Sequence, residues 1–355
     1  MSADSTTQSR AVPAALLEAI NDRSTALDCG EGKVREVLPD MASHGLLTLG
    51  VPFNKDGQLK QMASVISEVA QKCMSTAFGV WAHRMTIEYL AAANTEYTQT
   101  LLPDLASGRT PGITGMASAF RDMAGCGTLE ITATETEDGY VLNGPIRWAS
   151  NLYPDALLVT GVRTDRGQRL IVALPVSTQG VKIGKPFSLL AMDATESTYI
   201  NLEGVKIGKH QVLTDDFESF LTSVRPTFMV LQTAMCVGLA TTSQEQARNS
   251  LVGVNSVFRT EVEALGGRLT LVRSAMLKNA AAVGTDSGAT RAELLSMRLA
   301  GAETATAAAT LEAKTAGGKG YAKNSGASRR FREAAFLPVQ SPSEAQLRWE
   351  LASCS

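Results

Sequence analysis

The chain has 355 residues, of which 44% are hydrophobic and 19% charged, so it can bury one large core or several smaller ones. Its formal net charge of −2 gives no basic excess of the kind that binds nucleic acid. Aromatic residues make up only 5% and alanine is abundant, which favours packed helices over an all-β sandwich.

The sequence shows no sign of export, membrane insertion or metal binding. The N-terminal stretch is polar, and no apolar run reaches the roughly 20 residues that span a bilayer. The five cysteines are scattered singly, which indicates reduced thiols. His44, His83 and His210 lie far apart and in no ligand-spaced motif, so we predict no metal site. We expect a cytoplasmic protein without a membrane or nucleic-acid partner.

Three zones follow one another along the chain. Helical periodicity predicts an N-terminal helical domain over residues 1–110. Residues 111–214 alternate between apolar and polar side chains, and Asp138-Gly139 indicates a hairpin turn, so we predict a middle antiparallel β-barrel or sandwich domain. Residues 215–355 return to long helical patterns and predict a C-terminal four-helix bundle. The fold class is α+β.

Three motifs carry a family resemblance. Residues 138–151 read DGYVLNGPIRWASN, similar to a DGYxxNG turn followed by a KxWI[ST]N strand. Residues 316–321 read AGGKGY, similar to LGGxG[YF], and residues 329–335 read RRFREAA, similar to RxxRDA. In this order the motifs resemble the acyl-CoA dehydrogenase superfamily over nearly the whole chain. The resemblance implies a flavin, FAD, between the β domain and the C-terminal bundle, commonly at a dimer interface.

The resemblance also implies which residues meet the cofactor. Trp148 and Ser150 match residues that lie against the isoalloxazine ring, where a hydroxyl can bond to the N5 or O4 edge and tune hydride acceptance. Gly317 and Gly318 match a turn in which the backbone approaches the cofactor of the neighbouring subunit. Glycine permits that approach because it has no Cβ.

Two further segments are implied to contact the flavin. Met116, Ala117 and Ser118 fall in the loop that offers backbone N–H groups and a hydroxyl to the flavin. Arg248 matches, in a shortened segment, the arginine that meets the pyrophosphate, although a solvated helix arginine is an equal alternative. The shortening leaves FMN, or a reduced flavin that binds and dissociates, as an alternative to FAD.

The chain departs from the family at the catalytic base. A glutamate normally removes the substrate α-proton, which is only weakly acidic. Counting forward from Arg332 places this position at Gln340 or Ser341, and neither is a comparable base. Residues 225–231, where some members carry the glutamate instead, hold no acid. Glu344 is the nearest acid, but we expect it to open the last helix, where it suits the helix dipole.

Three functions stay open. The first is a flavin-dependent oxidoreductase acting on an acyl thioester or an analogous small substrate. The second is a reduced-flavin-dependent monooxygenase with a flavin reductase as partner; residues 115–118 (GMAS) resemble the GxAS of such members, and His83 is the candidate to face the ring. The third is a non-catalytic flavin- or acyl-binding protein. The family implies a homodimer or homotetramer.

Overall fold

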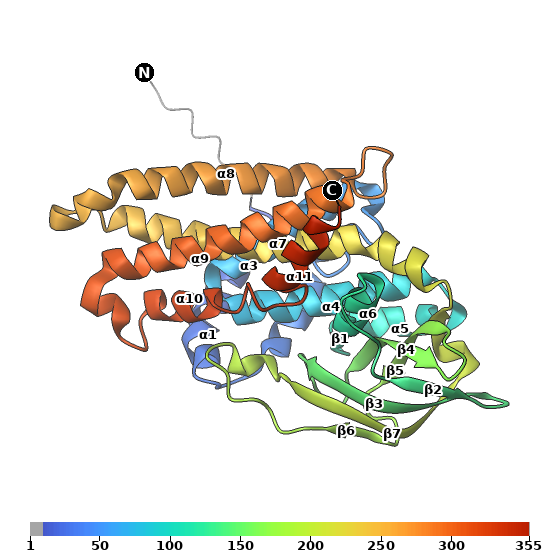
Figure 1. Cartoon of the computed structure of the whole chain (residues 1–355). Coiled ribbons are helices and arrows are strands. Elements are labelled where there is room, and N and C mark those ends of the chain that lie inside the picture. The colour runs from blue at the N-terminus through green and yellow to red at the C-terminus, as the bar shows by residue number, and fades with distance from the viewer. Residues whose placement is uncertain (1–9, 355) are drawn as a thin grey trace.

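We describe residues 10–354 of a computed structural model of the chain (Figure 1). Helices precede and follow a central sheet, so the predicted α+β class is confirmed. Residues 1–9, which hold most of the polar N-terminal stretch, and Ser355 lie outside the described residues. Short 3-10 turns connect some elements: η1 (Val34–Val37), η2 (Lys55–Gly57), η3 (Asp193–Thr195), η4 (Lys209–Gln211) and η5 (Gly253–Phe258).

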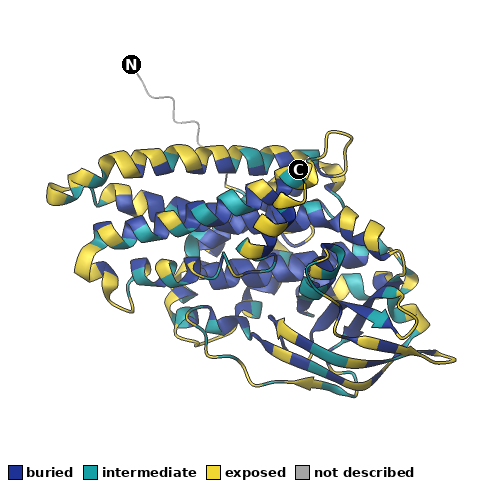
Figure 2. Cartoon of the chain, in the orientation of Figure 1, coloured by how far each residue is buried: buried dark blue, intermediate teal, exposed yellow. Residues whose placement is uncertain are grey.

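The N-terminal part is helical and is organised around α4. It consists of α1 (Ala14–Asp28), α2 (Leu38–Ser43), α3 (Leu59–Lys72), α4 (Met74–Ala93) and α5 (Glu96–Ala106). Every residue of α4 from Met74 to Leu90 is buried, and Figure 2 shows this helix between the sheet and the other helices. A helix that is apolar nearly all round requires such a central position. It ends at Asn94, whose left-handed backbone (φ 49°) caps it.

The sheet is mixed. Its strands are β1 (Gly112–Gly115), β2 (Thr132–Glu135), β3 (Gly139–Ala149), β4 (Leu157–Thr164), β5 (Arg169–Pro175), β6 (Val181–Ile183), β7 (Thr198–Gly208) and β8 (Val212–Thr214), with α6 (Ala117–Met123) after β1. They follow the order β6-β7-β3-β2-β4-β5-β8, and β1 pairs with β4. The predicted hairpin at Asp138-Gly139 is confirmed, since β2 and β3 pair antiparallel with Glu135 opposite Tyr140.

The expectation of purely antiparallel pairing was wrong for two pairs, because β4 runs parallel to both β1 and β2. Parallel strands need a long crossover, and α6 with the β2–β3 hairpin supplies it between β1 and β4. The alternating pattern of β4 serves two cores: Leu158 packs in the apolar cluster of the sheet, and Val159 packs in the larger helical core.

The C-terminal part is a bundle of long helices. Its elements are α7 (Phe217–Asn249), α8 (Arg259–Ala282), α9 (Arg291–Tyr321), α10 (Gly326–Ala334) and α11 (Glu344–Ala352). The helices α10 and α11 are short, and α7 packs against α8 and α9. The helix α3 of the N-terminal part also packs against α7. At the α3–α7 crossing, a Cβ on Gly238 would lie 2.2 Å from the Ser67 carbonyl oxygen, so only glycine fits this approach.

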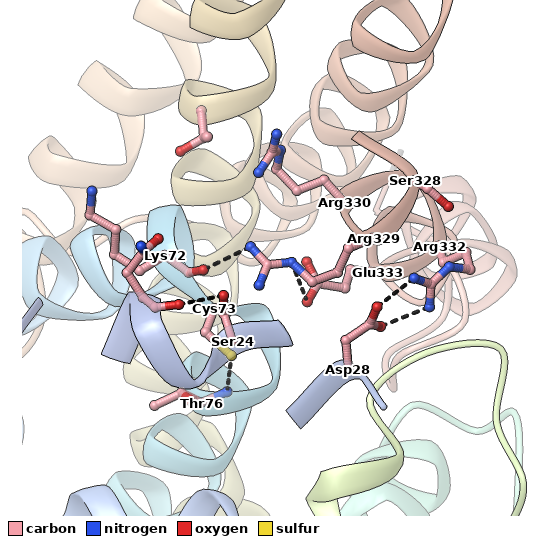
Figure 3. A network of polar contacts seen from close by, with 12 residues as sticks. Ser24, Asp28, Lys72, Cys73, Thr76, Ser328, Arg329, Arg330, Arg332 and Glu333 are labelled. Carbon is pink, nitrogen blue, oxygen red and sulfur yellow. Dashed lines mark hydrogen bonds and ion pairs between the residues drawn. The ribbon is translucent and has the colours of Figure 1, made fainter. Parts of the chain in front are cut away.

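Charged side chains dock α10 against the N-terminal helices (Figure 3). Arg332 donates two hydrogen bonds to Asp28 at the end of α1, from Nη1 to Oδ1 at 2.7 Å and from Nη2 to Oδ2 at 2.5 Å. Arg329 Nη2 donates to the Lys72 carbonyl oxygen at the end of α3, at 3.0 Å. A bidentate pair fixes orientation as well as position. These contacts therefore fix the position of α10 and of the start of the segment that follows it.

Glu333 is a buried carboxyl within this docking network (Figure 3). Its Oε1 lies 3.9 Å from Arg329 Nε. Burial raises the pKa of Glu333 from 4.5 to about 7, while Arg329 opposes the rise. The folded chain therefore keeps a proton that the unfolded chain releases between pH 4.5 and about 7. Stability falls as the pH rises through this interval.

We expect Glu333→Gln to remove this loss, because an amide resembles the protonated carboxyl. In urea unfolding from about pH 5 to about pH 8, the free energy of unfolding of the variant should rise relative to that of the parent, by up to ~3 kcal/mol. The matched control is Glu137→Gln in the exposed β2–β3 turn, which should follow the parent. Parallel curves for Glu333→Gln and the parent would contradict the prediction.

Candidate functional site

A cavity of about 390 Å³ lies where the three parts of the chain meet. Its walls come from α4, the β1–α6 segment, the end of β3, α7 and the segment between α10 and α11. The lining residues are Phe78, Trp81, Ala82, Thr114, Ala117, Trp148, Ala149, Ser150, Phe228, Phe336, Val339, Gln340 and Ser341. None of these thirteen is charged.

Aromatic rings form much of the cavity wall. Phe78 and Trp81 are three residues apart on α4, so they share one face of the helix and stack with centroids 5.5 Å apart. Phe336 meets the edge of Phe78 at 5.1 Å, and Phe228 meets Trp81 edge-on at 5.1 Å. These contacts join α4, α7 and the segment after α10 into one rigid apolar surface.

The end of β3 contributes Trp148 and Ser150. Trp148 is next to the last residue of the strand and Ser150 directly follows its end at Ala149, and the side chains of both line the cavity. Trp148 packs against Phe187, with centroids 4.7 Å apart, yet stays 47% exposed. An indole left open at the mouth of an apolar cavity offers a flat surface for a ring to cover.

Ser150 begins a chain of hydroxyl groups whose direction can be assigned. Ser150 Oγ lies 2.6 Å from Ser197 Oγ, which lies 2.8 Å from Thr195 Oγ1. Thr195 donates its proton to the Met192 carbonyl oxygen at 2.7 Å. Each hydroxyl has one proton, so Ser197 must donate to Thr195 and Ser150 must donate to Ser197. Ser150 can therefore offer a ligand only a lone pair.

Asn151 anchors the end of β3 to the rest of the protein. Its backbone has a positive φ of 60°, and its side chain is buried. Nδ2 donates to the Gly79 carbonyl oxygen of α4 at 2.8 Å and to the Gly112 carbonyl oxygen of β1 at 3.3 Å. Asn151 thus ties the strand that carries Trp148 and Ser150 to two other walls of the cavity.

Three lining residues carry buried polar atoms that have no hydrogen-bond partner among the described residues. They are Trp81 Nε1, Gln340 Nε2 and Ser341 Oγ. Buried polar groups in folded proteins are rarely left unpaired. Of the nine such side-chain atoms in the described residues, three belong to the lining of this cavity, where a bound ligand can supply the partners.

The cavity collects some of the residues predicted from the sequence. Trp148, Ser150, Ala117, Gln340 and Ser341 all line it. Met116 and Ser118, the predicted neighbours of Ala117, do not line the cavity. Met116 is fully buried and Ser118 is half-buried.

His83 was a candidate to face the ring, and the structure places it elsewhere. It is fully buried, and burial lowers its pKa to about 4, so the ring is neutral. Nδ1 accepts from the Gly112 N–H at 3.0 Å, which leaves Nε2 to donate to the Leu105 carbonyl oxygen at 3.0 Å. Both nitrogens are occupied by the backbone, so His83 holds α4 to its neighbours and has no free atom for a reaction.

The remaining predicted positions lie away from the cavity lining. Arg248 is exposed in the last turn of α7. Gly317 and Gly318 are exposed near the end of α9, where Gly317 has a φ of 60° that favours glycine. Their contact with the cofactor of a neighbouring subunit stays a prediction. Glu344 is the first residue of α11, as expected, and pairs with Arg348 at 2.9 Å.

Comparison with known proteins identifies the family. No family model matches the chain. The Probable acyl-CoA dehydrogenase YngJ of Bacillus subtilis is 26% identical over 316 residues, 82% of each chain. The mouse mitochondrial short-chain specific acyl-CoA dehydrogenase is 25% identical over 326 residues, 84% of this chain and 77% of its own. These relatives support the assignment of the chain to the acyl-CoA dehydrogenase superfamily. The resemblance predicted from the motifs is confirmed.

The fold agrees with this family. The structure of a glutaryl-coenzyme A dehydrogenase in complex with glutaryl-CoA superposes with a TM-score of 0.83 at 17% identity, covering 95% of this chain and 93% of the other. Acyl-CoA dehydrogenases are FAD-dependent oxidoreductases, so the predicted enzyme class and cofactor are confirmed at the level of the family.

The residues of the cavity fit a flavin. An isoalloxazine ring is flat, with apolar faces and a polar edge. The half-exposed Trp148 and the other aromatic side chains can cover its faces. The unpartnered atoms of Trp81, Gln340 and Ser341, and the free lone pair of Ser150, can meet polar edge atoms of a ring or of a substrate beside it.

Residues 10–354 contain neither a metal-binding cluster nor a helix that could span a membrane. No group of three or more His, Cys, Asp or Glu side chains is arranged to hold a metal ion in this part of the chain. No helix within it combines the length and apolarity that crossing a bilayer requires.

We expect Asn151→Ala to destabilise the fold by ~1–3 kcal/mol, because it leaves two buried carbonyl oxygens without this donor. Asn94→Ala is the matched control: Asn94 also has a positive φ, but it is exposed and its side chain only accepts an exposed hydrogen bond from Gln99, so its loss reports mainly backbone strain. Urea unfolding of both variants gives the difference. Equal losses would show that the side-chain bonds of Asn151 contribute nothing.

Proposed function

We propose that this flavin-dependent dehydrogenase or oxidase holds the FAD ring in the cavity beside Trp148 and oxidises its substrate without a carboxylate base from the protein. The observation that carries the proposal is the uncharged lining, which includes Gln340 and Ser341, the two positions that the family resemblance predicts for the glutamate. When bound, the flavin accepts a hydride equivalent from the substrate.

Different side chains of the cavity contact the flavin ring and the substrate. Trp148 offers its indole face to the ring, and Ser150 offers a lone pair to a ring N–H. Phe78, Phe228 and Phe336 exclude water from the space beside the ring and confine an apolar substrate. Each of these side chains is held by a neighbouring ring or hydroxyl, so the site is preorganised before the substrate arrives.

The missing carboxylate restricts the substrate. A positioned general base contributes on the order of 10²–10⁴-fold to proton removal. A substrate whose proton leaves readily, or that binds already ionised, does not need this contribution. An ordinary saturated acyl thioester does need it. The acyl thioester, a flavin reductase as partner and a homodimeric or homotetrameric assembly stay predictions.

A monooxygenase remains a second candidate, because its chemistry needs a dry cavity with hydrogen-bond donors and no base. The apolar lining and the unpartnered donors of Trp81 and Gln340 favour it. Anaerobic addition of substrate separates the two functions. A dehydrogenase or oxidase bleaches its bound oxidised flavin under these conditions, whereas a monooxygenase leaves it yellow and turns over only with reduced flavin and oxygen.

We expect Trp148→Ala to weaken FAD binding by roughly 10-fold, the loss of ~1.4 kcal/mol of ring contact. Trp349→Ala is the matched control, because Trp349 on α11 is equally exposed, at 48%, and lies outside the cavity lining. Equilibrium dialysis with FAD measures both affinities. Equal FAD affinities for the two variants would remove Trp148 from the cofactor site.

Restoring an acid tests the missing base directly. We expect Ser341→Glu to speed anaerobic flavin reduction by butyryl-CoA by on the order of 10²-fold over the parent, since the carboxylate can take the α-proton. Ser287→Glu, in the exposed α8–α9 loop, adds the same charge elsewhere and should match the parent. Stopped-flow absorbance follows the bleaching. A parent that is bleached as fast as Ser341→Glu would contradict the claim that the missing carboxylate limits the oxidation of an acyl thioester.

A further inference from the structure

Arg298 on α9 is a fully buried cation without an acidic partner. Its side chain is 0% exposed, and no ion pair joins it to an acid within residues 10–354. Other buried arginines are paired: Arg84 with Glu88 at 2.8 Å and Arg225 with Glu350 at 2.6 Å. A guanidinium does not lose its proton inside a protein. The interior beside Arg298 therefore holds an uncompensated positive charge, which is costly.

Arg298 is bonded to the segment that contains Gln340 and Ser341, where the resemblance predicts the family's glutamate. Nη2 donates to the Leu337 carbonyl oxygen at 2.9 Å and to Gln340 Oε1 at 3.3 Å. Nε donates to Gln232 Oε1 at 3.0 Å, and Gln232 Nε2 donates onward to the Ser341 carbonyl oxygen at 2.9 Å. The cation thus lies one side chain behind the cavity wall.

This network fixes which way the Gln340 amide faces. A guanidinium has donors only, so the atom of Gln340 next to Arg298 must be the oxygen. The amide NH₂ then remains, and it is the atom without a partner. Gln340 therefore presents a donor whose amide is polarised by the charge behind it.

The other two unpartnered atoms of the lining can also donate hydrogen bonds. Trp81 Nε1 can only donate a hydrogen bond, and the Ser341 hydroxyl can donate one. Both residues line the cavity with Gln340, and the lining includes no acid. A ligand that satisfies these atoms must bring an acceptor, and a negatively charged acceptor also compensates Arg298.

We propose that the cavity binds a substrate with an anionic oxygen, such as a carboxylate, phenolate or enolate, on an apolar body. Gln340, Ser341 and Trp81 donate to the oxygen, and Arg298 supplies the compensating charge through Gln340. The aromatic wall of Phe78, Phe228 and Phe336 receives the body. This inference deepens the proposed function, on which it rests, by naming the substrate class: a family glutamate here would repel the anion that this chain attracts.

Calorimetric titration of the full-length purified chain with benzoate and with benzamide tests this polarity, because the probes share their ring and differ in charge. We expect benzoate to bind at least about 10-fold more tightly than benzamide. In Gln340→Glu the new carboxylate pairs with Arg298, so the variant should fold and lose this preference. Gln168→Glu, in the exposed β4–β5 turn, makes the same charge change and should keep it.

Equal binding of the two probes by the parent, or an unchanged preference in Gln340→Glu, would overturn the anion site. The visible absorbance of the same samples reports bound flavin independently. Bound flavin without a preference for benzoate overturns this inference and leaves the proposed function standing. A preference for benzoate in a chain that takes up no flavin leaves the anion site standing and overturns the proposed function.

Discussion

The burial of α4 determines how the sheet and the helical bundle are arranged around it. Burial on all sides from Met74 to Leu90 obliges the sheet and the bundle to pack on opposite sides of one helix. Its polar side chains must then be satisfied internally. Arg84 and Glu88 pair with each other, and His83 bonds to two backbone groups of neighbouring segments. The candidate cavity lies beside Phe78 and Trp81 on this helix, where the N-terminal helices, the sheet and the C-terminal bundle meet.

The shape of the cavity and its chemistry depend on different bonds. Asn151 holds the β3 wall through the carbonyl oxygens of Gly79 and Gly112. Arg298 and Gln232 hold the opposite wall through carbonyl oxygens as well. Because these hydrogen bonds are made to backbone carbonyl groups, the side chain at a lining position can change without moving the wall. This separation explains how a fold that superposes on an acyl-CoA dehydrogenase can lack an acid in the lining.

Local patterns in the sequence predicted the parts of the structure that depend on neighbouring residues. The turn at Asp138-Gly139 and the helical and alternating zones follow from spacing alone. Counting from Arg332 reached Gln340 and Ser341, because the docked α10 is followed by a short segment with little freedom. His83 was misjudged because α4 is buried on every side, so helical spacing could not tell a wall residue from a packing residue.

The Arg298 network could not be read in the same way, because Gln232, Arg298 and Gln340 come from three segments that only the tertiary fold brings together. One signal was present. Arg298 follows the buried Leu294 and Leu295 by four and three residues, so helical spacing places it on the buried face of α9. The parallel pairing of β4 was missed for a related reason: strand alternation sets which face a residue occupies and says nothing of the partner strand's direction.

The buried cation and the missing glutamate are consistent with each other. A carboxylate at position 340 would lie within hydrogen-bond distance of the guanidinium that now contacts Gln340 Oε1. An opposite charge at that distance favours the ionised form and lowers the pKa of a carboxyl group. Such a glutamate would be a weaker base, held as half of an ion pair. A glutamate at position 340 would thus be a poor base beside Arg298, whereas the amide of Gln340 is polarised by the positive charge behind it. The family thus accounts for the fold and the cofactor, and under our proposal the positive charge behind Gln340 favours a substrate with an anionic oxygen.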